Sequence, residues 1–154
     1  MPLIDPNGLP FVDEHRVRVD ASAAAVWRAL TERVRQFSDN GALARVLGAE
    51  PRAATVAPAA DTPLAAGAAL TGFAVAEVVP ERLLRLAGRH RFSRYALVFD
   101  VDIGPDATVL SARTYAAFPG LRGKVYRALV IGSGAHRLVT VRLLRSVRRD
   151  AERL

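Results

Sequence analysis

Cysteine is absent from this chain of 154 residues, and its only methionine is the first residue. Disulfide bonds, thiol nucleophiles and cysteine-ligated zinc sites are therefore excluded. No run of about eighteen apolar residues free of glycine and proline occurs, so no membrane-spanning helix is expected. The first residues, Met1 to Pro6, also lack the basic stretch and apolar core of a secretory signal. We therefore expect a cytoplasmic protein.

Signatures of bound cofactors are also missing. The phosphate-binding pattern G-x-x-x-x-G-K-[ST] does not occur, and the glycines between residues 120 and 134 lack the spacing of a dinucleotide-binding loop. A metal site would need a third ligand beside His90 and His136, and His15 lies far from both along the chain. We therefore expect no cofactor and no metal ion.

The net charge of +7 is concentrated at the end of the chain. Residues 121–154 contain nine of the 22 basic residues and two of the 15 acidic ones, so the remainder is neutral. A hydrated helix face accounts for this pattern, and an anionic partner is the alternative. Aromatic residues do not alternate with the basic ones, as they would in a protein that stacks single-stranded bases. We therefore expect no specific nucleic-acid binding.

The segment from Phe118 to Leu154 predicts one long amphipathic helix that starts at Pro119-Gly120. At one hundred degrees per residue, a single stripe collects apolar residues that should be buried. The members of this stripe are Leu121, Val125, Leu129, Gly132, His136, Val139, Leu143 and Val147. The opposite side carries Arg127, Arg137, Arg142, Arg145, Arg148 and Arg149. Gly132 and Gly134 each cost about 1 kcal/mol inside a helix, so we expect that a neighbouring group needs the space.

The first forty residues predict an arm, a strand and two short helices. Residues 1–10 contain three prolines and a glycine and should form an extended N-terminal arm. Residues 11–19 alternate toward their end as a half-buried strand does. Residues 23–30 place apolar side chains at helical spacing, and a second short helix follows over about residues 32–38.

The middle of the chain predicts a loop followed by an antiparallel meander. Residues 42–49 are a candidate strand, and the proline- and alanine-rich residues 50–67 predict a loop that acts as a flap. Turn residues then separate strands over 69–79, 82–92, 93–103 and 107–118.

Alternation along these strands assigns their faces. In one strand the inward side chains are those of Tyr95, Leu97, Phe99, Val101 and Ile103. In the preceding strand they are those of Leu84, Leu86, His90 and Phe92, with Gly88 at the same parity. The arginines of both strands fall on the other face, and a second histidine therefore points inward.

The register of the last strand depends on the hairpin over residues 104–107. A four-residue hairpin pairs Phe99 with Ala112 and turns Leu110, Ala112, Thr114 and Phe118 inward. A slip by one residue would instead turn Arg113 and Tyr115 inward, where Arg113 could anchor a carboxylate. Both registers fit the alternation, and the short hairpin favours the first.

Three stretches resemble the SRPBCC superfamily, which is related to the START domains. They are residues 19–27 with the pair Val26-Trp27, residues 78–83, and residues 118–127 running on to His136. The last stretch resembles uncharacterised bacterial members. The resemblance covers nearly the whole chain and implies one α+β helix-grip domain over residues 1–154. In that fold a curved antiparallel sheet of about six or seven strands wraps a long C-terminal helix, with two short helices after the first strand.

The resemblance implies that the protein binds a hydrophobic or aromatic small molecule in a cavity between sheet and helix. The residues expected to line the cavity are Trp27, Phe73, Leu86, His90, Tyr95, Leu97, Phe99, Ala112, Leu129, Gly132, Ser133 and His136. A binding protein is preferred to an enzyme. The alternative is a polyketide cyclase or dehydratase-like enzyme in which His136 and His90 exchange protons. A second alternative is an interaction module that uses the basic helix.

Each of these residues also has a structural interpretation. The two histidines could be hydrogen-bonded groups of a partly wet core, and Trp27 and Phe73 could be core residues. Apolar residues also lie among the arginines on the outer side of the last helix, where the arm or a second subunit could cover them. These are Val130, Ile131, Leu138 and Val141. This patch predicts a homodimer.

Overall fold

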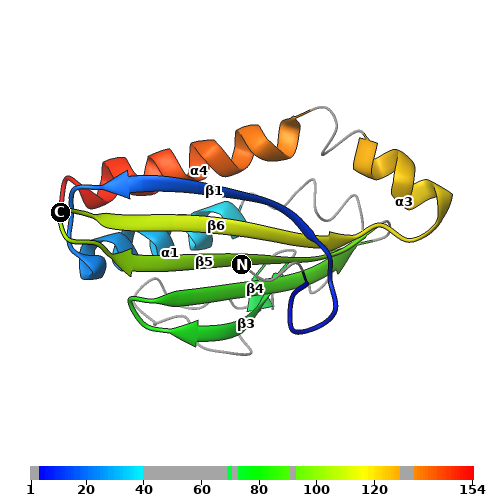
Figure 1. Cartoon of the computed structure of the whole chain (residues 1–154), viewed down its shortest axis with the longest axis horizontal. Helices are drawn as coiled ribbons and strands as arrows, with labels where there is room; N and C mark the ends of the chain where they lie inside the picture. The colour runs from blue at the N-terminus through cyan, green and yellow to red at the C-terminus, as the bar shows by residue number, and fades with distance from the viewer. Residues whose placement is uncertain (1–3, 40–68, 71–72, 91–92, 129–133) are drawn as a thin grey trace.

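The computed structural model describes residues 4–39, 69–70, 73–90, 93–128 and 134–154. Six antiparallel strands form one curved sheet in the order β1-β6-β5-β4-β3-β2 (Figure 1). The strands are β1 (Phe11–Val19), β2 (Ala69–Leu70), β3 (Phe73–Val79), β4 (Leu83–His90), β5 (Ser93–Ile103) and β6 (Thr108–Ala117). The helices are α1 (Ala23–Asp39), α3 (Gly120–Arg127) and α4 (Ala135–Ala151). None of these helices is long and apolar enough to cross a membrane.

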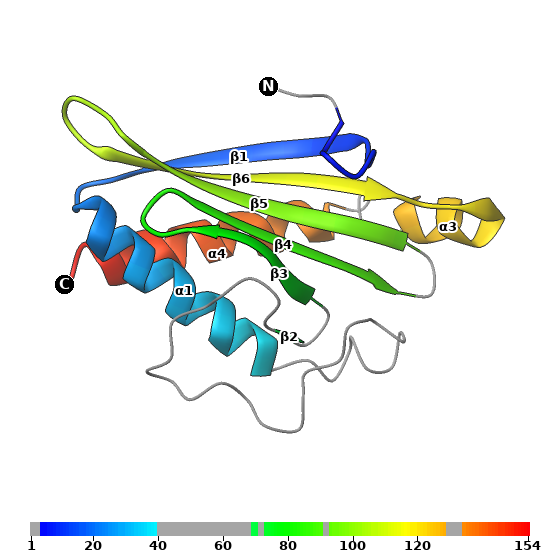
Figure 2. The ribbon, with the colours of Figure 1, turned by 90° about the horizontal axis from the view of Figure 1, so that it is seen from below.

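Two helices cover one face of the sheet. Figure 2 shows α1 and α4 side by side against the concave face, with α3 past the end of α4. Helix α1 is one continuous helix, so the predicted pair of short helices is wrong for residues 23–39. Its first turn is capped by Ser22, whose Oγ accepts the N–H of Ala25 at 3.1 Å. The predicted strand at 42–49 and flap at 50–67 lie outside the described residues.

The main core lies between the concave face and these two helices. Val26, Leu30 and Val34 follow each other at one helical turn on α1 and are buried there. They meet buried residues of the sheet and of α4, which include Val19, Val75, Leu84, Leu86, Phe99, Val101, Leu110, Ala112, Leu144 and Val147. Ile103 shares the parity of Phe99 but is exposed, because it lies at the end of β5 beside the hairpin.

The register predicted from the short hairpin is confirmed. Phe99 pairs with Ala112, and Leu97 pairs with Thr114. Arg113 therefore lies on the outer face, where its guanidinium forms an ion pair with Asp100. The predicted strand over residues 69–79 is wrong in one respect, because Ala69–Leu70 folds back and pairs with the start of β3.

The outer face of the sheet carries a second, smaller core. Leu9 packs there with Ala96, Val98 and Tyr115, and all four are buried. The prediction of an extended arm needs correction, because the described residues 4–10 fold back until Ile4 pairs with Pro10. The buried carboxylate of Asp5 holds this turn by accepting the N–H of Leu9 at 2.6 Å.

The prediction of one helix from Phe118 to Leu154 is wrong. Gly134 has φ +78°, a left-handed conformation that ends any helix arriving from α3, and α4 begins at the next residue. A Cβ atom added at Gly134 would meet no other atom within 4 Å, so glycine is needed here for its left-handed backbone and not to make room for a neighbouring group. Leu121 and Val125, which the stripe placed inside, are 79% and 55% exposed.

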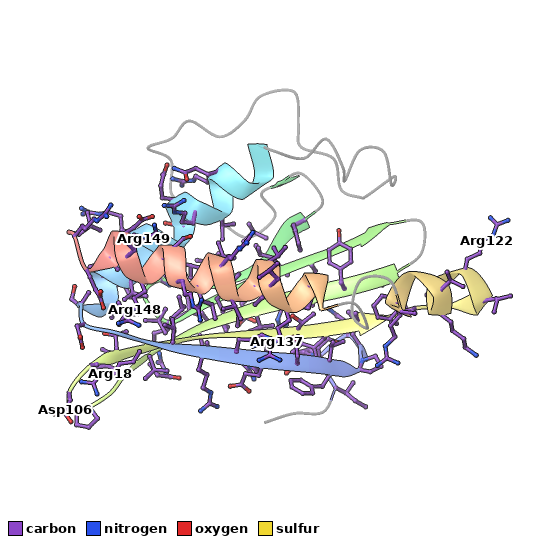
Figure 3. All side chains as sticks on the ribbon, turned by 90° about the horizontal axis from the view of Figure 1, so that it is seen from above. Arg18, Asp106, Arg122, Arg137, Arg148 and Arg149 are labelled. Carbon is purple, nitrogen blue, oxygen red and sulfur yellow. The ribbon has the colours of Figure 1, made fainter. Side chains whose placement is uncertain are left out.

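The predicted stripe is partly confirmed on α4. Val147 is buried, Leu143 packs against the main core and His136 faces the sheet, whereas Val139 is exposed. The other buried positions of this helix are Thr140, Leu144 and Ala151. The predicted arginine face is confirmed on α4: Figure 3 shows Arg137, Arg148 and Arg149 along this helix, and all three are exposed.

Candidate functional site

A β-bulge at the start of β1 separates Phe11, on the outer face of the sheet, from a carboxylate on the helix side. Phe11 pairs with Tyr115, but the next pair joins Asp13 to Thr114, so one extra residue is inserted in β1. Phe11 consequently packs on the outer face, its ring 5.8 Å from that of Tyr115. Asp13 joins the inward parity that continues through His15 to Val19.

Four polar side chains from three elements meet on the concave face, and we call them the Asp13 cluster: Asp13, His15, Thr114 and His136. Asp13 Oδ2 lies 3.2 Å from Nε2 of His15, and Asp13 Oδ1 lies 3.5 Å from Nε2 of His136. Nε2 of His136 also lies 3.0 Å from Oγ1 of Thr114. Strand β1, strand β6 and the first turn of α4 therefore converge on one carboxylate and one imidazole.

The Asp13 cluster is partly open to solvent. The side chains of His15, Asp13 and His136 are 18%, 26% and 22% exposed, and Thr114 is buried. Asp13 Oδ1 is itself closed off and accepts no hydrogen bond of standard geometry within the described residues. A small molecule could therefore reach the histidine rings, whereas one carboxylate oxygen faces only protein.

Asp13 is held in its charged form. Burial raises the pKa of its carboxyl, but the close contact with the ring of His136 lowers it, with further contributions from His15 and Thr114. The net effect is a pKa below the ordinary 3.8. At neutral pH the cluster therefore contains a carboxylate anion beside two imidazoles.

The structure shows no metal-binding arrangement in the part of the chain that it describes. No group of three or more histidine, cysteine, aspartate or glutamate side chains is placed there to hold an ion.

The predicted apolar lining falls into two sets. Leu86, Phe99 and Ala112 are enclosed in the main core. Trp27, Phe73 and Leu97 are only partly buried against it. Tyr95 is also partly buried, with its ring 5.1 Å from that of Phe73 in an edge-to-face contact. The partly buried set leaves aromatic surface beside the core.

Three predicted site residues, Leu129, Gly132 and Ser133, lie outside the described residues, as does the side chain of His90. The backbone nevertheless separates His90 from His136. His136 contacts Thr114, which is linked through Leu97 to Leu86 on β4, and His90 lies four residues further along that strand. At roughly 3.3 Å per residue, this places the β4 position about 13 Å away along the strand.

Sequence reasoning did not include Asp13, His15 or Thr114 among the candidate site residues. Thr114 was correctly placed on the inward face, and His15 shares the parity of Val17 and Val19. Extending that parity by two residues reaches Asp13, so the alternation contained the signal. The bulge was the missing element, because Phe11 has the same parity in sequence but the opposite face in the structure.

No protein-family model matches the chain, and no curated protein matches it. Solved structures do. Protein MLL2253 from Mesorhizobium loti is 13% identical with a TM-score of 0.54, covering 92% of this chain and 96% of that one. CalU16 from Micromonospora echinospora is 18% identical with a TM-score of 0.52, covering 98% and 89%. Ara h 8.0201 is 7% identical with a TM-score of 0.53, covering 94% and 98%.

These similarities establish architecture. They extend over at least nine-tenths of this chain, and the curved antiparallel sheet with a C-terminal helix on one face agrees with the architecture expected from the sequence. The chain therefore has the α+β helix-grip fold that its resemblance to the SRPBCC superfamily predicted.

Proposed function

We propose that the protein binds a hydrophobic or aromatic small molecule between the concave face of the sheet and α4. The observation that carries this proposal is the Asp13 cluster. A carboxylate anion and two imidazoles interrupt a face that is otherwise apolar, and they remain reachable by solvent. A face used only for packing would gain stability from apolar residues at these positions, because burying charged groups is costly.

The neighbouring aromatic surface supports an apolar ligand body. Phe73, Tyr95 and Leu97 share the concave face with the cluster and are not fully buried. Such sites combine apolar walls with a few polar groups that orient the ligand. The polar end of the ligand would meet His136, and its apolar body would cover the aromatic residues.

Native mass spectrometry of freshly purified protein tests this proposal. We expect a retained apolar small molecule, released when the protein is denatured. Phe73→Ala should reduce retention, whereas Ile103→Ala should not, because Ile103 is exposed at the far end of β5. Protein that carries no ligand and shows no thermal stabilisation by a panel of naphthalene derivatives would contradict the proposal.

A second candidate is an enzyme of the cyclase or dehydratase type at the same site. The contact between Asp13 and His136 favours it, because a carboxylate beside an imidazole stabilises the protonated ring during proton transfer. His136 would exchange a proton with a carbonyl substrate. Replacing His136 by alanine should then abolish turnover and leave ligand affinity nearly unchanged. If the wild type shows no measurable turnover and the His136 variant loses ligand affinity, the enzyme hypothesis is rejected and the binding function remains.

The third candidate, binding of an anionic partner by the basic helix, is supported by exposed arginines on α4 (Figure 3). Binding to anionic vesicles or nucleic acid should then weaken steeply with salt. Binding that is insensitive to salt would exclude this use of the helix.

A further inference from the structure

From the geometry of the Asp13 cluster we infer that Asp13 fixes the proton of neutral His136 on Nε2, so that Nδ1 accepts a hydrogen bond from the ligand. The ligand is then an aromatic compound with a hydroxyl group, a phenol or an enol. This inference rests on the proposed binding function and names its ligand class.

The first step concerns the atoms around Nε2 of His136. Oγ1 of Thr114 lies 3.0 Å from it, and Oδ1 of Asp13 lies 3.5 Å from it. An ionised carboxylate can only accept hydrogen bonds. A proton on Nε2 is attracted by both oxygens, whereas a lone pair on Nε2 would face the carboxylate and be repelled.

The second step concerns the direction of the Thr114 hydroxyl. Thr114 is the cross-strand partner of Asp13, and a threonine hydroxyl can donate its hydrogen to an anion while its oxygen accepts a second hydrogen bond. Oγ1 is then left to accept the N–H of Nε2. In this order the N–H of Nε2 has Oγ1 of Thr114 as its acceptor, whereas the opposite tautomer would place a lone pair of Nε2 beside the carboxylate.

The third step is the consequence for the ligand. With Nε2 protonated, Nδ1 of a neutral imidazole is an acceptor. An ether or carbonyl oxygen beside Nδ1 would bring its own lone pair against that of the nitrogen, whereas a hydroxyl group would donate a hydrogen bond to Nδ1. The partly buried Phe73 and Tyr95 rings suit a flat aromatic body attached to that hydroxyl.

The groups that could disturb this tautomer are few within the described residues. Asp13 faces the ring of His136 from β1, with His15 at the other carboxylate oxygen, and Thr114 faces the ring from β6. Only the neutral ring has two tautomers, so the test is made at a mildly basic pH.

The probes are 2-naphthol and 2-methoxynaphthalene, which share the aromatic body and differ in the hydrogen-bond donor. Trp27 is the only tryptophan and packs at the edge of the main core, so its fluorescence can report binding. We expect the wild type to bind 2-naphthol about tenfold more tightly than 2-methoxynaphthalene. Asp13→Asn should reduce this preference to less than about threefold without weakening 2-methoxynaphthalene.

Asp106→Asn is the matched control. It makes the same chemical change in the exposed 104–107 hairpin (Figure 3), so the tenfold preference should persist. Long-range ¹H–¹⁵N correlation spectra provide a direct readout of the ring, with His136→Gln identifying its signals among the three histidines. We expect the proton on Nε2 in the wild type and a mixture of tautomers in Asp13→Asn.

The outcomes separate the inference from the function on which it rests. Equal affinity of the wild type for both probes, or a proton found on Nδ1, would overturn the inference and leave the binding function intact. Failure to bind either probe, or any other naphthalene derivative, would remove the binding function itself. The spectrum and probe preference of the wild type decide the matter even if Asp13→Asn does not fold.

Discussion

Asp13 shows how the register of one strand sets the chemistry of a face. The regular pairing of β1 with β6 from Asp13 to Val19 places the carboxylate on the helix side, and the bulge lets Phe11 take the outer side although it has the same parity in the sequence. On the helix side the carboxylate meets His15 and His136, and part of its hydration is replaced by contacts with protein. Those contacts hold the anion in place despite the cost of burying it.

Replacing Asp13 by asparagine should therefore destabilise the fold in a manner that depends on pH. The pKa of Asp13 is lowered on folding, so its stabilising effect is complete above the unfolded pKa and disappears as pH falls through the folded value. We expect Asp13→Asn to cost about 1–2 kcal/mol at neutral pH and clearly less near pH 2.5. Urea unfolding at both pH values measures the difference.

Asp106→Asn again serves as the control, because Asp106 lies in an exposed hairpin. It should change the free energy of unfolding by less than about 0.5 kcal/mol at either pH. A cost of Asp13→Asn that is the same at neutral and acidic pH would show that the charge of Asp13 does not contribute to stability.

At the scale of elements, the break before α4 decides what the terminal segment can do. Because Gly134 is left-handed, α3 and α4 are independent helices, and α4 brings His136 to the sheet in its own first turn. Figure 1 shows α3 past the N-terminal end of α4, where Leu121 and Val125 are exposed. The long helix expected from sequence would have placed this segment over the sheet.

Gly134→Ala distinguishes the two arrangements. In a left-handed position the methyl group costs about 1–2 kcal/mol, so the free energy of unfolding should fall by that amount. In an unbroken helix, alanine would instead stabilise by about 1 kcal/mol. Gly134→Asn is the companion variant, since asparagine tolerates the left-handed region better and should cost less. An increase in the free energy of unfolding of Gly134→Ala would instead support a helix that continues through residue 134.

Helices α1 and α4 are joined by an ion pair with two contacts. Arg33 reaches Asp150 through Nε at 2.5 Å and through a terminal nitrogen at 3.0 Å. Hydrogen bonding to Arg33 is the main cause that lowers the pKa of Asp150. The paired geometry fixes the angle at which the end of α4 meets the middle of α1.

A double-mutant cycle with Arg33→Gln and Asp150→Asn should give a coupling of about 0.5–1 kcal/mol, because both side chains are about one-third exposed. The pair Arg148 and Glu152, within α4 and its C-terminal cap, provides the comparison at about 0.3–0.5 kcal/mol. Urea unfolding in low salt measures both cycles. Equal couplings would mean that the contact between helices adds nothing beyond a surface pair.

The sequence predicted the helices and strands more accurately than the positions at which they are interrupted. The pairing of Phe99 with Ala112 followed from alternation and a short hairpin, since period-two patterns and turn length together leave few registers. The bulge in β1 reverses the face of Phe11 relative to Asp13, and the left-handed Gly134 precedes the first residue of α4; each is a single-residue backbone event. A pattern averaged over many residues does not reveal them, and both lie next to the Asp13 cluster.

At the scale of the whole molecule, the concave face of the sheet is mainly apolar, the outer face combines a small apolar core with ion pairs, and the basic excess of the sequence lies in its last 34 residues. Helices α1 and α4 cover the concave face, and the arm with Leu9 covers part of the outer face. The arginines of α4 face solvent, away from both cores. The start of β1 therefore contributes to three features at once: the arm turn, the outer core at Phe11, and the Asp13 cluster.

The arm should accordingly contribute to stability through one side chain. Leu9 is buried against Val98 and Tyr115, so Leu9→Ala should lower the free energy of unfolding by about 2 kcal/mol. Ile4→Ala is the matched control in the same arm, because Ile4 is 58% exposed and its loss should cost less than about 0.5 kcal/mol. Urea unfolding measures both variants.

Because the bulge follows the arm directly, Leu9→Ala should also weaken 2-naphthol binding if the arm helps to hold β1 in register. Equal and small losses for the two variants would mean that the outer face is stable without the arm, and that the bulge is maintained by the pairing of β1 with β6 alone.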